Sequence, residues 1–408
     1  MQRFPLGKFV AVSVFLWSVL IFLHCTATSF GGLVPLRFFL GVFEGCMVPA
    51  IEITMGMFFT PQEYTEVQPL WWISCMGCPI PAGFIAYGLL WTDSAVKPWK
   101  FFMILTGGVT LVLAITCWFF YPDNPAQARI LSKEERVQVI RKVHEATRSS
   151  IEQKTFKPAQ ARETIRDPVS WLFLLTAFCL MIANNLQYQQ NLLFLKIGVS
   201  NLGSTLVSAV GGGVATISCI VGAILLKYLP NNGAWIGVFF CLPAVACGIG
   251  MVALPWTNTL GLLACLTLGG NTFGVTYIIV LSWANSSSAG YTKKLLRNVF
   301  FMIGYGIANI ISPQIWVESD GPRYYGAWSA QIVVSWTLAP AILVLIRHIL
   351  SRRNIERHAW IAEQTALGNE GHGFVEKTGE DGELIKEKVD VSFLDLTDLE
   401  NKFFIYPL

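Results

Sequence analysis

The chain has 408 residues, of which 53% are hydrophobic and 13% charged, with a formal net charge of +3. Soluble domains carry about 25% charged residues, so this composition excludes a disordered chain and argues against a soluble enzyme of this size. Charged residues concentrate in segments 121–170 and 347–408, which is the layout of a protein that crosses a membrane several times. Because no basic stripe with interleaved aromatic residues is present, we expect no nucleic-acid partner.

Ten apolar runs are long enough to cross a bilayer, which takes about 20 residues each. In chain order they are 7–27, 33–59, 67–91, 99–121, 171–193, 203–229, 234–254, 259–283, 296–317 and 326–350. We therefore predict an all-α, polytopic membrane protein, a helical bundle of the lipid bilayer with ten transmembrane helices. Four basic clusters lie inside the cell when both termini are placed in the cytoplasm, and these clusters include Arg3, Lys293 and Arg353.

The runs divide four plus six around the charged central block. We predict an incomplete N-terminal bundle over 1–121, a cytoplasmic central loop over 122–170, a C-terminal bundle over 171–350 and a cytoplasmic tail over 351–408. Transporters are often built from two repeated halves, so a six-span second half predicts that two spans are missing in front of the first.

Local signals refine the polar segments. A capping-box pattern at Ser132 and Glu135 predicts a helix over 132–148, lying either on the inner membrane face or free in solvent. The Gly-rich tail from about residue 360 is expected to be mobile, its last 17 residues excepted.

Ionisable side chains inside a membrane span are expensive and are functional candidates by default. Three lie well inside a run, and all three are on the second: Arg37, Glu44 and Glu52. Arg37 and Glu44 are seven residues apart and share a helix face. A carboxyl group whose pKa is raised in a low dielectric and lowered by a nearby Arg can load and release a proton, so we expect a role in proton coupling. The alternative is that these groups pair with neighbouring helices and fix packing.

Polar side chains in other runs are candidates for lining a substrate cavity. Asn184 and Gln187 belong to an amide-rich segment of the fifth run, and Asn298, Tyr305 and Asn309 share one face of the ninth. The weaker candidates in the eighth run are Asn271 and Tyr277. For Asn184 and Gln187 the alternative is that the outer end of the helix emerges into water. For the residues of the eighth and ninth runs the alternative is hydrogen bonding between helices.

No motif of an enzyme is evident. The sequence has no phosphate-binding loop, no Cys/His cluster with zinc spacing and no Ser/His/Asp set, and its ten cysteines all fall inside apolar runs. We therefore expect no catalytic activity, no cofactor and no metal site.

Several motifs resemble those of one transporter family. Segment 37–45 (RFFLGVFEG) resembles the fourth-helix motif of major facilitator transporters, in the form found in the fungal anion:cation symporters of the allantoate permease branch. Segments 121–136, 298–324 and 395–406 resemble that branch's central-loop entry, eleventh helix with its following loop, and C-terminal ending. On this resemblance the first run corresponds to the family's third helix, and the first two helices have no counterpart.

The resemblance implies a plasma-membrane secondary transporter that takes up a small organic anion, such as allantoate, nicotinate or a related carboxylate, together with protons. We expect it to act as a monomer. The competing hypothesis is a non-transporting membrane sensor or an inactive, truncated relic of such a transporter.

Overall fold

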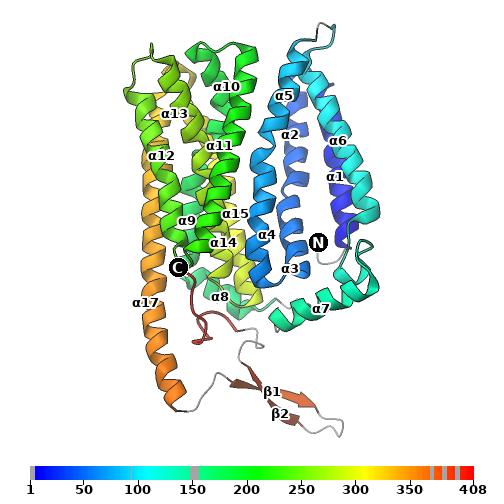
Figure 1. The fold of residues 1–408 in the computed structure, drawn as a ribbon, viewed down its shortest axis with the longest axis vertical. Helices are drawn as coiled ribbons and strands as arrows, with labels where there is room; N and C mark the ends of the chain where they lie inside the picture. The colour runs from blue at the N-terminus through cyan, green and yellow to red at the C-terminus, as the bar shows by residue number, and fades with distance from the viewer. Residues whose placement is uncertain (1–4, 93, 148–155, 368–371, 379–383, 391–395) are drawn as a thin grey trace. The chain divides into compact units, whose positions relative to one another are not determined.

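A computed structural model describes residues 5–92, 94–147, 156–367, 372–378, 384–390 and 396–408 (Figure 1). Arg3, named above, lies outside the described residues, as does residue 395 at the start of segment 395–406. Ten helical segments in the described part are long and apolar enough to cross a membrane, from Leu6–His24 to Tyr325–Ala366. The protein is therefore an all-α, multi-pass membrane protein, as the hydropathy pattern predicts.

The chain forms two compact units. Unit 1 comprises Met1–Leu70 and Ala82–Ile151, and unit 2 comprises Trp71–Pro81 and Glu152–Leu408. The helices of the first 151 residues are α1 (Leu6–His24), α2 (Phe30–Glu44), α3 (Met47–Phe58), α4 (Pro61–Gly77), α5 (Pro79–Leu90), α6 (Pro98–Phe120), η1 (Pro125–Gln127) and α7 (Lys133–Thr147). In unit 1, α1 packs along α6 and against α2.

Unit 2 continues with further helices and one hairpin. They are α8 (Pro158–Arg166), α9 (Pro168–Met181), α10 (Asn185–Ile197), α11 (Asn201–Tyr228), α12 (Gly233–Ala253), α13 (Thr259–Thr272), α14 (Gly274–Ser286), α15 (Tyr291–Ile311), η2 (Ser312–Ile315), η3 (Glu318–Asp320), α16 (Tyr325–Ala330), the π-helix η4 (Gln331–Leu338), α17 (Ala339–Ala366) and the antiparallel strands β1 (His372–Thr378) and β2 (Leu384–Asp390).

Several predicted runs are interrupted rather than continuous. The second run divides into α2 and α3 at Gly45 and Cys46, so Glu52 lies on a different helix from Arg37 and Glu44. The third divides before Pro79, whose ring and missing N–H break an α-helix. The fifth divides just before α10 at Asn184, whose side chain donates a hydrogen bond to Asn309 Oδ1 on another helix.

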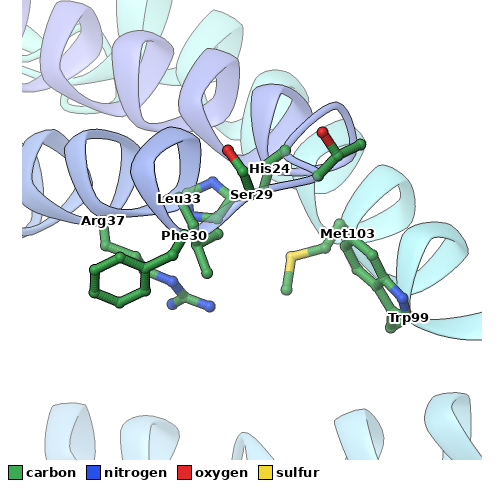
Figure 2. A pocket seen from close by; sticks show the side chains of 9 residues that line it. His24, Ser29, Phe30, Leu33, Arg37, Trp99 and Met103 are labelled. Atoms are coloured by element: carbon green, nitrogen blue, oxygen red, sulfur yellow. The ribbon is translucent and has the colours of Figure 1, made fainter.

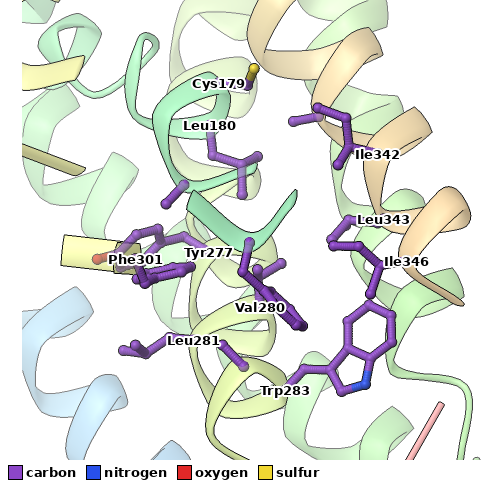
Figure 3. Packing of buried hydrophobic residues seen from close by; sticks show 14 of the residues in the cluster. Cys179, Leu180, Tyr277, Val280, Leu281, Trp283, Phe301, Ile342, Leu343 and Ile346 are labelled. Atoms are coloured by element: carbon purple, nitrogen blue, oxygen red, sulfur yellow. The ribbon is translucent and has the colours of Figure 1, made fainter. Parts of the chain in front are cut away.

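The core of unit 2 lies where α9, α14, α15 and α17 meet. Figure 3 shows Leu180, Tyr277, Phe301 and Leu343 from these four helices directed into one apolar cluster. Phe301 and Leu343 are fully buried there. Apolar burial of this kind stabilises the bundle by roughly 25 cal/mol for each Å² removed from solvent.

Close packing of α9 on α15 depends on a glycine. A Cβ atom built on Gly304 would overlap the backbone carbonyl oxygen of Leu174. The two helix backbones therefore approach more closely than any other residue at position 304 permits, as small residues allow in membrane helices.

The central block contains the predicted surface helix. In α7, the Ser132 amide donates a 2.7 Å hydrogen bond to Glu135 Oε2, and the Glu135 amide donates to Ser132 Oγ over 3.2 Å. This reciprocal pair is the capping box that the sequence predicts. Each residue's amide donates to the side-chain oxygen of the other, so the pair fixes where α7 begins.

The tail differs from the sequence-based expectation. The last transmembrane helix continues as α17 to Ala366, well past residue 350, and β1 pairs with β2 in an antiparallel hairpin after it. Good helix formers such as Arg and Glu extend α17 into the polar segment, which hydropathy alone does not reveal.

Candidate functional site

Two of the predicted ionisable residues lie on α2, none of whose residues is buried. Arg37 and Glu44 are both exposed, and Glu52 on α3 is half-buried. The ion pairs among the described residues do not include Arg37 or Glu44. The two therefore share a helix, as the spacing predicts, without forming a salt bridge to each other.

Arg37 borders a pocket of about 350 Å³ in unit 1 (Figure 2). The pocket lies where α1 ends and where α2 and α6 begin. Its walls are His24, Ala27, Thr28, Ser29, Phe30, Leu33, Arg37, Trp99 and Met103. Ser29 fixes the start of α2, because its side chain accepts a hydrogen bond from the Gly32 amide at 3.2 Å.

Four of the predicted polar residues of unit 2 come together. Asn184, at the break between α9 and α10, donates a 2.7 Å hydrogen bond to Asn309 Oδ1 on α15. Asn309 in turn donates to the Tyr305 carbonyl over 2.9 Å, and the Tyr305 and Tyr277 rings lie 6.0 Å apart. These four residues, hereafter the amide–tyrosine group, join three helices, with Tyr305 exposed and Tyr277 buried.

The other predicted cavity residues are placed elsewhere. Gln187 is exposed, one turn beyond Asn184. Asn271 donates a 2.7 Å hydrogen bond to the Thr267 carbonyl of its own helix. Asn298 donates a hydrogen bond to Asn285 Oδ1. Asn298 lies about 16 Å from Asn309 along α15, at a rise of about 1.5 Å per residue.

Sequence reasoning missed a buried charge cluster in unit 2. Lys293 and Arg297 on α15 have fully buried side chains, as do Asp167 and Asp398. Lys293 Nζ lies 2.9 Å from Asp398 Oδ1 and 2.7 Å from Glu163 Oε1. In the sequence this cluster is visible only as two basic residues, Lys293 and Arg297, at the start of the ninth apolar run. Asp398, which pairs with Lys293, is more than one hundred residues away in sequence.

Arginine and aspartate complete this cluster. Arg297 Nη2 lies 2.9 Å from Asp167 Oδ2, and Arg353 Nη2 lies 3.0 Å from Asp167 Oδ1. Burial alone raises the pKa of Asp167, but the positive charges of Lys293, Arg297 and Arg353 outweigh it, so the pKa lies below its usual value. Asp167 also caps α9 by accepting from the Val169 amide at 3.3 Å.

The end of the chain packs against the same region. Tyr406, which is 2% exposed, donates a 2.8 Å hydrogen bond from its hydroxyl to Asp398 Oδ2. Asn354 on α17 exchanges two hydrogen bonds with the Tyr406 backbone, and Trp283 on α14 donates to the Pro407 carbonyl over 2.8 Å. Residues 396–408 therefore form a strap, hereafter the C-terminal strap, across the helices of unit 2.

Helical spans in two compact units, with polar groups held at breaks between helices, are typical of polytopic membrane transporters. The family model described as "Major Facilitator Superfamily" matches residues 1–313, and the chain belongs to that superfamily. This family membership agrees with the resemblance carried by segment 37–45.

Two relatives and one solved structure place the chain further. It is 46% identical over 413 residues to the high affinity cysteine transporter of Saccharomyces cerevisiae, covering 100% of this chain and 78% of the relative. It is 27% identical over 419 residues to the allantoate permease of that yeast, covering 99% of this chain and 72% of the permease. The proton:xylose symporter XylE shares the fold, with a TM-score of 0.59 and 11% identity over 85% of this chain and 79% of that one.

Proposed function

We propose that this protein is a proton-coupled symporter that takes up a small carboxylate-bearing solute across the plasma membrane, with both termini in the cytoplasm. The observation that carries the proposal is that Arg37 and Glu44, on one transmembrane helix of a major facilitator protein, form no ion pair among the described residues. Charged side chains within a membrane span are costly, which makes them candidates for a role in transport.

Glu44 is the proposed proton carrier. As the α2 surface alternates between a dry and a hydrated environment, the proton affinity of an exposed carboxyl group there changes with it. Arg37 lies two turns away on the same face, where it supplies the positive charge that a carboxylate substrate needs. Glu52, on the following helix, is proposed as a second proton site.

The amide–tyrosine group is proposed to line a substrate cavity within unit 2. It offers hydrogen-bond donors and acceptors without net charge, which suits a polar solute. Gln187, Asn271 and Asn298 remain candidates for the same cavity, although the bond from Asn298 to Asn285 favours a role in packing α15 on α14.

Cysteine is the first substrate to test, because it carries a carboxylate and because a relative at 46% identity is named a cysteine transporter. Allantoate follows, since the allantoate permease aligns over nearly the whole chain. We propose that the protein acts as a monomer and performs no catalysis.

The test is uptake of radiolabelled cysteine and allantoate by cells that lack their own uptake of each compound. The proposal predicts accumulation that rises as external pH falls and collapses when a protonophore is added. Uptake of neither compound, with the protein present at the cell surface, contradicts the proposal and supports the competing hypothesis of a non-transporting sensor or relic.

A further inference from the structure

The pocket at the junction of α1, α2 and α6 contains a buried side chain with an unused hydrogen-bonding atom. His24 is 3% exposed, and its Nδ1 lies 2.6 Å from the Leu20 carbonyl oxygen. A carbonyl oxygen only accepts, so Nδ1 carries the proton. In the neutral ring Nε2 is therefore an acceptor, and it is buried with no hydrogen-bond partner in the part of the chain that the structure describes.

A buried polar atom without a partner is unfavourable, by about 1–3 kcal/mol for a typical group. His24 is one of the pocket's wall residues, so a molecule that enters the pocket and displaces the side chains covering Nε2 can supply the missing donor. Figure 2 shows His24 and Arg37 on one side of the pocket and Trp99 and Met103 on the other.

Arg37 supplies the second recognition element. Its guanidinium group has only donors, is always charged, and matches a carboxylate in a two-pronged geometry. Among the described residues it takes part in no ion pair. The pocket thus presents a cation and a neutral acceptor, with Leu33 and Met103 as an apolar wall.

We propose that this pocket is a binding site for a small zwitterionic amino acid. The carboxylate pairs with Arg37, the ammonium group donates to His24 Nε2, and a short apolar or sulfur-containing side chain packs against Leu33 and Met103. A pocket of about 350 Å³ is at the small end of ligand-binding cavities, which span roughly 300–1,000 Å³. This site deepens the proposed function, because it selects amino acids among carboxylates.

The test is equilibrium binding of radiolabelled cysteine to the purified protein, in competition with two analogues. 3-Mercaptopropionate lacks the ammonium group, and cysteamine lacks the carboxylate. We expect cysteine to bind at least tenfold more tightly than either analogue. The Arg37→Gln variant should lose the preference over cysteamine, and His24→Leu should lose the preference over 3-mercaptopropionate.

Two further variants keep the test decisive. Arg37→Lys retains the charge and should retain most of the binding, whereas Arg129→Gln removes an exposed arginine that does not border the pocket and should bind as the wild type does. If folded Arg37→Gln and His24→Leu proteins keep the wild-type affinity and analogue preference, the site is wrong.

Binding and transport separate the two proposals. Cysteine binding with these preferences but without proton-driven uptake supports the site and contradicts the proposed function. Proton-driven uptake with an unchanged affinity in both variants supports the function and overturns the site.

Discussion

Asn184 Nδ2 donates a 2.7 Å hydrogen bond to Asn309 Oδ1, which ties the break between α9 and α10 to the C-terminal end of α15. The two residues are 125 positions apart in sequence. Because Asn184 interrupts a transmembrane helix, this bond also holds the ends of two half-helices in place. Broken helices of this kind often form transporter binding sites.

Replacing Asn184 and Asn309 by alanine, singly and together, should reveal a coupled pair. Each single change should cost about 1 kcal/mol of folding stability and raise the KM for uptake, while the double change costs less than the sum of the two. Thermal unfolding in detergent and uptake kinetics measure the two effects. Additive costs would show that the pair does not act as a unit, and Gln314→Ala is a control on the same segment.

Gly304→Ala should destabilise unit 2, because the added methyl group overlaps the Leu174 carbonyl and forces α9 and α15 apart. The expected cost is about 1–3 kcal/mol. Gly306→Ala is a matched control, since a Cβ atom there meets nothing within 4 Å. Equal melting temperatures for the two variants would contradict the close approach of these helices.

Asp398→Asn should release the C-terminal strap, because it removes a buried charge that pairs with Lys293 at 2.9 Å. Breaking a buried ion pair typically costs about 3–5 kcal/mol, and the remaining partners Glu163 and Asp167 should reduce that figure here. Limited proteolysis of the C-terminus reports release. Glu356→Gln changes an exposed residue on α17 and should leave the strap protected from the protease. If the strap is equally protected in Asp398→Asn, the pair of Asp398 with Lys293 does not hold it in place.

Stability should fall at acidic pH through Asp167. Its pKa is lowered in the folded state, so the ionised carboxyl group contributes stability above its ordinary pKa of about 3.9 and loses that contribution as pH falls through the folded value. Melting temperatures between pH 7 and pH 3 test this. The Asp167→Asn variant, which keeps a capping side chain, should lack part of the acid-induced decrease; an acid decrease as large as that of the wild type would contradict the assignment.

The positions of the helices could be predicted from the sequence because apolar runs of bilayer length and the capping box at Ser132 are local signals. The breaks at Gly45 and Asn184 could not, since hydropathy averages over them. The sequence indicates each member of the amide–tyrosine group separately as a polar residue within an apolar run. It does not predict that Asn184 pairs with Asn309, because that pairing depends on tertiary contacts. The pairing of Lys293 with Asp398 was not predicted, because Lys293 alone resembles the basic residues that ordinarily flank a transmembrane span.

The His24 pocket shows the same limit. In sequence, His24 is one of five scattered histidines, and nothing local indicates that its Nε2 lacks a partner. That property arises only when the end of α1 packs beside α2 and α6. Arg37, in contrast, stands out in sequence because a charge in an apolar run is rare.

The most direct test of the account is transport by purified protein in liposomes, comparing the wild type with Glu44→Gln. With an imposed inward proton gradient the wild type should accumulate cysteine, and the variant should not. Exchange of internal for external cysteine, which needs no net proton movement, should persist in the variant. Glu134→Gln, on the exposed surface of α7, is the control. Undiminished gradient-driven accumulation by Glu44→Gln would contradict the proposal that Glu44 carries the proton.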